Sequence, residues 1–127
     1  MKVNQFTMQS PDYFNVFGLG DSAALPTAKT GAAVRKQAPV IVENILRLMD
    51  SKDILPESKG YNGYSSCPLV TGYGKMLLAE FGYGNKLMSD PLLSTFVDTT
   101  KEQYSMWLLK KYGLPILYWN FMLRGKA

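Results

Sequence analysis

The chain contains one cysteine, Cys67, and no histidine. Cys67 lies in a segment rich in glycine and tyrosine ahead of a predicted strand, where a thiol could act as a redox group or nucleophile if its pKa is lowered. A Ser-His-Asp or Cys-His pair within the chain is excluded, so activation would need another segment or a cofactor. An internal disulfide and a cysteine-rich zinc site are also excluded. The alternative is a buried, unreactive thiol.

A second candidate site joins Asp21 to the start of a predicted helix. An apolar run at residues 16–19 ends just before Asp21, which indicates a buried parallel strand with a carboxylate at its carboxyl end. Such a carboxylate can accept hydrogen bonds from sugar or ribityl hydroxyls. The small residues Gly31, Ala32 and Ala33 would let a flat, electron-rich ligand such as a reduced flavin approach the amides at the helix start. The alternative is an alanine-rich helix packed closely on a sheet.

The C-terminal segment combines aromatic and basic residues. Residues 113–123 carry no charge and include Tyr118, Trp119 and Phe121. The segment is flanked by four basic side chains, those of Lys110, Lys111, Arg124 and Lys126. This combination is typical of a short helix that lies in the headgroup region of a membrane and attracts anionic lipid. The alternative is a helix that covers the protein's own core.

A long helix must position the first of these sites. Apolar residues at three- and four-residue steps predict an amphipathic helix over residues 30–49. The residues of this apolar pattern are Val34, Ala38, Ile41, Val42, Ile45, Leu48 and Met49. Thr30 is the expected N-cap, and Pro39 is expected to kink the helix or to start a new turn.

A hairpin and two helices are predicted after it, which makes the fold class α+β. Residues 67–71 and 75–81 predict two strands joined by a turn at residues 72–74 in an antiparallel hairpin. Residues 85–97 are expected to be irregular. A helix over residues 101–112 is expected to be broken by Gly113 and Pro115, and a second helix would run over residues 115–123.

Composition limits the classes of function. With 127 residues, of which 46% are hydrophobic, the chain can form about one small domain with a buried core. The net charge of +4 arises in the tail, because all 10 acidic residues precede Gln103. Nucleic-acid binding along the body is therefore not expected. The longest apolar run is shorter than the roughly 20 residues that span a bilayer, and the first residues lack the pattern of a signal or transit peptide.

Three stretches resemble a known family. Residues 15–37 (NVFGLGDSAALPTAKTGAAVRKQ) and residues 64–73 (YSSCPLVTGY) look like the C-terminal part of sulfide:quinone oxidoreductase. Residues 117–125 (LYWNFMLRG) are similar to the end of that family's mitochondrial and bacterial type II-like members. The resemblance implies a C-terminal fragment of a flavoprotein with two Rossmann-type domains and a membrane-docking region.

The resemblance also implies an activity and a set of site residues. Members of the family oxidise sulfide at a pair of cysteines and pass electrons to FAD and then to a membrane quinone. Cys67 matches the second redox cysteine, and the tail residues Tyr118, Trp119 and Phe121 would meet the quinone and the membrane. The expected FAD-binding residues are Asp21 at the ribityl or pyrophosphate region, Lys29 and Thr30 beside the isoalloxazine ring, and Gly31, Ala32, Ala33 and Val34 at its pyrimidine end.

Two features of that family are missing from the sequence: the Gly-x-Gly-x-x-Gly loop that holds the FAD pyrophosphate, and the partner cysteine. We therefore expect a truncated or split product with three segments. Residues 1–59 would be a partial FAD-binding Rossmann-type segment, residues 60–99 a hairpin that carries the redox cysteine, and residues 100–127 an amphipathic membrane-docking tail.

Two functions are predicted as alternatives. The first is the C-terminal portion of a sulfide:quinone oxidoreductase that oxidises sulfide to protein-bound persulfide and is inactive without its N-terminal portion. Its cofactor would be FAD, and its partners would be sulfide, a quinone, the missing portion and the anionic surface of a bacterial cytoplasmic or mitochondrial inner membrane. The second is a non-catalytic peripheral membrane module, or a remnant, that binds anionic lipid through its basic aromatic tail.

Overall fold

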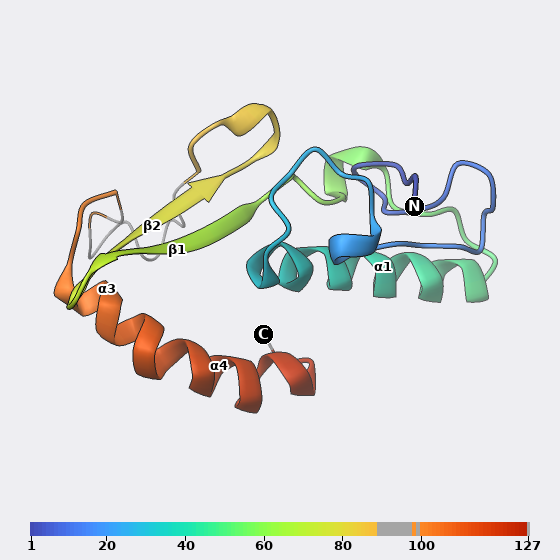
Figure 1. Cartoon of the computed structure of the whole chain (residues 1–127). Helices are drawn as coiled ribbons and strands as arrows, with labels where there is room; N and C mark the ends of the chain where they lie inside the picture. Colours follow the sequence, from blue (N-terminus) through green and yellow to red (C-terminus); the bar gives the residue numbers. More distant parts are fainter. Residues whose placement is uncertain (89–97, 99, 127) are drawn as a thin grey trace. The chain divides into compact units, whose positions relative to one another are not determined.

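The computed structural model describes residues 1–88, 98 and 100–126, and the chain divides into two compact units (Figure 1). The first unit comprises Met1–Ser65 and Phe81–Lys86, and the second comprises Ser66–Glu80 and Leu87–Ala127. Helices are combined with a two-stranded antiparallel sheet, so the predicted α+β class is confirmed. Residues 89–97 of the segment predicted to be irregular lie outside the described residues.

Helix α1 (Gly31–Met49) forms the scaffold of the first unit and begins where Thr30 predicts it. The Thr30 hydroxyl oxygen accepts a hydrogen bond from the Ala33 amide at 3.2 Å, which satisfies one of the amides that a helix start leaves without an intrahelical partner. The helix continues through Pro39. Residues 30–49 therefore form the predicted helix almost to the residue.

The buried face of α1 differs from the face that the apolar pattern predicts. The buried residues of the helix are Ala33, Gln37, Val40, Ile41 and Asn44. At 3.6 residues per turn, Val42 and Met49 project from nearly the opposite side. Their side chains are 55% and 76% exposed. The face that turns inward thus carries two polar amides, and much of the expected apolar face turns outward.

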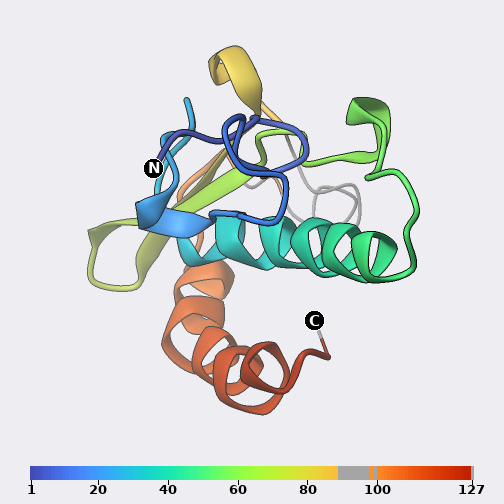
Figure 2. The ribbon, with the colours of Figure 1, turned by 90° about the vertical axis from the view of Figure 1, so that its right-hand side faces the viewer.

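The buried amides of Gln37 and Asn44 bind loops to α1. The side-chain oxygen of Gln37 accepts a hydrogen bond from the Gly20 amide at 2.8 Å. Asn44 donates to the Thr7 carbonyl at 2.9 Å and accepts from the Leu55 amide at 2.8 Å. Buried backbone groups outside regular structure need such partners, because leaving them unpaired is costly. Figure 2 shows the N-terminal loops lying along one side of α1.

The parallel strand predicted at residues 16–19 does not form in this structure. Phe17 makes a single antiparallel bridge with Gln9, and the segment continues into a 3-10 turn at Gly20–Ser22. A strand needs a neighbouring strand along its length, and the part of the chain that the structure describes places no parallel neighbour beside this segment. The prediction is therefore wrong, because a short apolar run does not itself specify a pairing partner.

Two tyrosines complete the core of the first unit. The rings of Tyr61 and Tyr83 lie 5.7 Å apart edge to face, and Phe6 packs against Tyr83 in the same way. The Tyr83 hydroxyl donates to the Gln5 carbonyl, and the Tyr61 hydroxyl donates to the Tyr64 carbonyl at 2.6 Å. Burial, and then the neighbouring Tyr61, raise the pKa of Tyr83 far above its usual value. Tyr83 therefore remains protonated and serves as a structural donor.

The predicted antiparallel hairpin is confirmed. Strand β1 (Ser65–Gly72) and strand β2 (Lys75–Phe81) are joined by the two-residue connection Tyr73-Gly74. Gly74, the second residue of this connection, has a φ of +70°, a conformation that glycine adopts without steric cost.

The predicted break between the C-terminal helices is wrong. Helix α3 (Tyr104–Leu108) continues through a π-helical turn (Leu109–Gly113) into helix α4 (Leu114–Asn120), and a 3-10 turn follows at Met122–Arg124. Gly113 keeps helical dihedral angles, with φ −70° and ψ −47°. Pro115 lacks an amide hydrogen and would leave a carbonyl one turn earlier without its donor. It lies just after the π turn, where the hydrogen-bond register changes.

We predict that Asn44→Leu lowers the free energy of unfolding by about 2–4 kcal/mol, because it leaves the buried Thr7 carbonyl and Leu55 amide without partners. Urea unfolding of the whole chain, followed by circular dichroism, measures this change. The control Glu43→Gln alters the adjacent, exposed position and should change the free energy by less than about 0.5 kcal/mol. Equal stability of the Asn44→Leu variant and the wild type would contradict the role assigned to this amide.

Candidate functional site

The turn at Gly20–Ser22 packs against the beginning of α1, so the structure brings the Asp21 turn close to the helix start. A Cβ atom added to Gly20 would lie 3.1 Å from a methyl carbon of Val34. The Gly20 amide also donates to Gln37, one turn further along the helix. Asp21 itself is exposed at the outside of the turn. The turn that carries Asp21 thus packs against the beginning of α1 without the predicted strand.

In the part of the chain that the structure describes, no group accepts a hydrogen bond from the first two amides of α1, and the space beside them is open. The Ala33 amide donates to the Thr30 hydroxyl and the Val34 amide to the Thr30 carbonyl at 3.1 Å. The amides of Gly31 and Ala32 precede these bonds and point out of the helix end. A Cβ atom added to Gly31 would meet nothing within 4 Å. This end therefore offers small residues, open space and the positive end of the helix dipole, which suits the electron-rich end of a flavin.

Three of the predicted cofactor residues also have structural roles. Thr30 is the N-cap of α1. The Lys29 ammonium donates to the Ala23 carbonyl, which ties the loop before the helix to the turn after Asp21. Ala33 is only 1% exposed and packs in the core, so it offers a ligand at most its backbone.

Cys67 is a free, partly exposed thiol near the start of β1. It lies within the strand, because β1 begins two residues earlier than predicted, at Ser65. The next residue, Pro68, accepts a hydrogen bond through its carbonyl from the Lys110 ammonium at 2.9 Å. Lys110 belongs to the π turn, so this bond links the backbone beside Cys67 to the C-terminal helices. The sequence contained no local signal for this contact.

Further contacts attach α3 to the turn end of the hairpin. The ring of Tyr73 lies 5.2 Å from that of Trp107. Lys75 and Glu102 form an ion pair at 3.6 Å. A hydrogen bond from the Thr71 side chain, followed by the charge of Lys75, lowers the pKa of Glu102. The Glu102 carboxylate, two residues before α3, thus stays ionised at neutral pH and contacts one residue of each strand of the hairpin.

The aromatic residues predicted to meet a membrane are exposed along α4 and the turn after it. Tyr118, Trp119 and Phe121 all have solvent-accessible side chains, and Ile116 and Leu123 are exposed beside them. The rings of Tyr118 and Trp119 meet edge to face at 5.2 Å. Among the described residues, no helix has the length and hydrophobicity needed to cross a membrane. No cluster that could bind a metal ion occurs in that part of the chain either.

Comparison with known proteins gives the relatives of this chain. No family model matches it. It is 46% identical over 124 residues to the mitochondrial sulfide:quinone oxidoreductase of Schizosaccharomyces pombe. It is 44% identical to those of Dictyostelium discoideum and Mus musculus. The chain is a homologue of the sulfide:quinone oxidoreductases.

The resemblance inferred from the sequence motifs is thereby confirmed. The matches cover 97–99% of this chain but only 26% of each sulfide:quinone oxidoreductase, so the chain spans about a quarter of the length of these relatives. This coverage is consistent with the C-terminal portion expected from the motifs.

The structure is also similar to a chain in the cryo-EM structure of the Tetrahymena thermophila mitochondrial ATP synthase, described as an F1Fo composite tetramer. The TM-score is 0.75 at 26% sequence identity, over 91% of this chain and 27% of that chain. Here too, the match is to about a quarter of a longer polypeptide.

We predict that Lys110→Met loosens the strand beside Cys67, because it removes the donor to the Pro68 carbonyl and keeps the aliphatic stem. The loss of one such hydrogen bond costs about 1 kcal/mol, which corresponds to roughly fivefold faster local opening. Hydrogen exchange of peptides that cover residues 65–72 measures it. Lys110→Arg should retain the wild-type rate, and residues 31–49 should not respond. Unchanged exchange in Lys110→Met would show that the bond does not hold the strand.

Proposed function

We propose that this chain supplies the C-terminal portion of a sulfide:quinone oxidoreductase, in which Cys67 is one of the two redox cysteines. The observation that carries the proposal is the identity of 44–46% to proteins of that name over nearly the whole chain. That match spans the segments that hold both Cys67 and the start of α1. The partly exposed position of the thiol on β1 supports the proposal, because a redox cysteine must be reachable by its substrate.

The start of α1 and the Asp21 turn would hold the cofactor, FAD, which when bound supplies a two-electron acceptor that a quinone can reoxidise. The amides of Gly31 and Ala32 would stabilise negative charge at the pyrimidine end of the ring system. The absence of a side chain at Gly31 would allow that ring to approach the helix end closely. Asp21 would accept hydrogen bonds from hydroxyl groups of the same ligand. Lys29 and Val34 would border the site from the loop and from the second turn.

Cys67 would take part in the oxidation of sulfide through a disulfide with a cysteine of the remaining polypeptide. A hydrosulfide ion attacks the sulfur of the partner cysteine, the S–S bond breaks, and Cys67 leaves as a thiolate while the partner becomes a persulfide. The sulfur of the substrate is thereby oxidised, and the disulfide accepts its two electrons. Lys110 supports this exchange by holding the backbone at Pro68, next to the leaving thiolate.

The C-terminal helices would place this chemistry at a membrane that contains the quinone. The relatives are named as mitochondrial proteins, so we propose the mitochondrial inner membrane as the site of action. The exposed apolar and aromatic residues of α4 would enter the headgroup region. Arg124 and Lys126 would add attraction to anionic lipid.

We predict that Cys67→Ser abolishes sulfide-dependent reduction of FAD when the chain is assembled with the remaining three quarters of a relative, because serine cannot form the disulfide. The measurement is the loss of flavin absorbance after addition of sulfide, and the rate should fall to background. The control Thr71→Ser on the same strand should reduce flavin at the wild-type rate. Undiminished reduction in Cys67→Ser would refute the assignment of Cys67. FAD-dependent turnover by the isolated chain would refute the need for the remaining polypeptide.

We predict that the double variant Trp119→Ser and Phe121→Ser weakens binding to vesicles of phosphatidylcholine and phosphatidylglycerol by at least about tenfold, because two apolar rings no longer enter the interface. Co-sedimentation with the vesicles measures the affinity. Phe14→Ser replaces an aromatic residue of the first unit that is more exposed than either of these two, and this variant should bind as the wild type does. An equal loss in both variants would contradict a specific role of the tail.

A further inference from the structure

We infer that the outward apolar face of α1, together with the loop at residues 14–17, is the docking surface for the polypeptide that corresponds to the remaining three quarters of the relatives. The inference rests on the proposed function, since that function requires such a polypeptide, but it concerns a surface and not the redox chemistry.

The outward face of α1 carries a continuous apolar stripe. Val42, Ile45, Leu46 and Met49 follow one another at the steps of a helical face, and their side chains are between 41% and 76% exposed. The stripe lies on the side opposite Gln37 and Asn44, which face the core. A helix that is buried on one side and apolar on the other is typical of a helix that is covered on both sides. In the first unit, only one side of α1 is covered.

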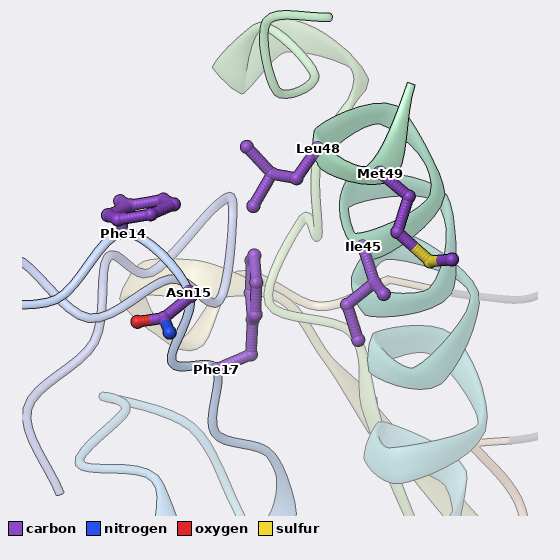
Figure 3. A pocket seen from close by; sticks show the side chains of 6 residues that line it. All are labelled: Phe14, Asn15, Phe17, Ile45, Leu48 and Met49. Carbon is purple, nitrogen blue, oxygen red and sulfur yellow. The ribbon is translucent and has the colours of Figure 1, made fainter. Parts of the chain in front are cut away.

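A hollow next to this stripe extends the apolar surface. It has a volume of about 230 Å³ and is lined by Phe14, Asn15, Phe17, Ile45, Leu48 and Met49. Figure 3 shows the ring of Phe17 between Phe14 and the side chains that α1 contributes. Phe14 is 73% exposed, although nothing in its chemistry favours contact with water. The hollow offers room for an apolar side chain inserted from a partner.

Charge on this surface is small and internally balanced. Glu43 and Arg47 border the stripe and pair with each other at 3.6 Å. The partner that fits is therefore an apolar face of a folded polypeptide and not a charged ligand. Monomeric proteins seldom leave an apolar surface of this kind uncovered.

The relatives indicate which polypeptide covers it. This chain matches only 26% of each sulfide:quinone oxidoreductase, so in those proteins the same segment is part of a chain about four times as long. A helix inside a larger fold needs an apolar outer face when another part of that fold covers it. This explains why α1 has an outward apolar stripe that no residue of the first unit covers.

The test compares two double variants that introduce the same residue one position apart. Val42→Gln with Met49→Gln alters the stripe, whereas Glu43→Gln with Asp50→Gln alters two neighbouring acidic residues, one beside the stripe and one at the C-cap of α1. Each full chain is mixed with the part of the Schizosaccharomyces pombe relative that the match leaves out, and affinity is measured by titration. The stripe variant should bind at least tenfold more weakly than the wild type, and the acidic-residue variant within twofold of it. Circular dichroism and the thermal midpoint of each isolated chain should match the wild type.

Three outcomes would overturn the inference. Binding of the stripe variant at wild-type affinity, or no binding by the wild type, would exclude the stripe as the docking surface. A dimer of the wild-type chain that the stripe variant abolishes would assign the stripe to a second copy. A lower thermal midpoint of the isolated stripe variant would show that the stripe already stabilises the isolated chain and is not left free for a partner. Cys67→Ser should bind at wild-type affinity, so a failure of the redox proposal would leave this test intact.

Discussion

The first unit depends on two buried side-chain amides that form hydrogen bonds with backbone groups of the surrounding loops. Gln37 and Asn44 lie seven residues apart on one face of α1 and bind backbone groups of Gly20, Thr7 and Leu55. No sheet of the first unit pairs these segments, so the helix provides the partners that buried amides and carbonyls need. The requirement also sets the rotation of α1, because both amides must face the loops. The apolar residues on the other side then point outward.

Local signals in the sequence predicted the elements well. Thr30 followed by a glycine and two alanines predicted the N-cap and start of α1, and glycine around Tyr73 predicted the hairpin turn. The buried face of α1 was not predictable in the same way, since a count of apolar positions gives no weight to Gln37 and Asn44. Their burial becomes favourable only through partners that are distant in the chain. Similarly, the apolar run at residues 16–19 indicated burial but could not specify a neighbouring strand.

In the candidate site, too, features set by neighbouring residues could be predicted from the sequence, whereas contacts between distant residues could not. The turn that carries Asp21 packs against the beginning of α1 through Gly20, although the strand expected before the turn is absent. Lys110 could not be identified from the sequence, because its acceptor is a backbone carbonyl 42 residues away. That contact connects the strand of Cys67 with the helices proposed to meet the membrane. Both features lie in the segment that matches about a quarter of the length of each sulfide:quinone oxidoreductase.

Amide hydrogen exchange of the intact chain, resolved by residue, tests most directly whether the two buried amides hold the first unit together. The amides of Gly20 and Leu55 lie outside regular α-helix and strand, yet they donate to side chains of α1. We expect these two amides to exchange as slowly as the central amides of α1, because they open only when the helix separates from its loops. Exchange of both at the rate of free loops, with α1 itself protected, would contradict it.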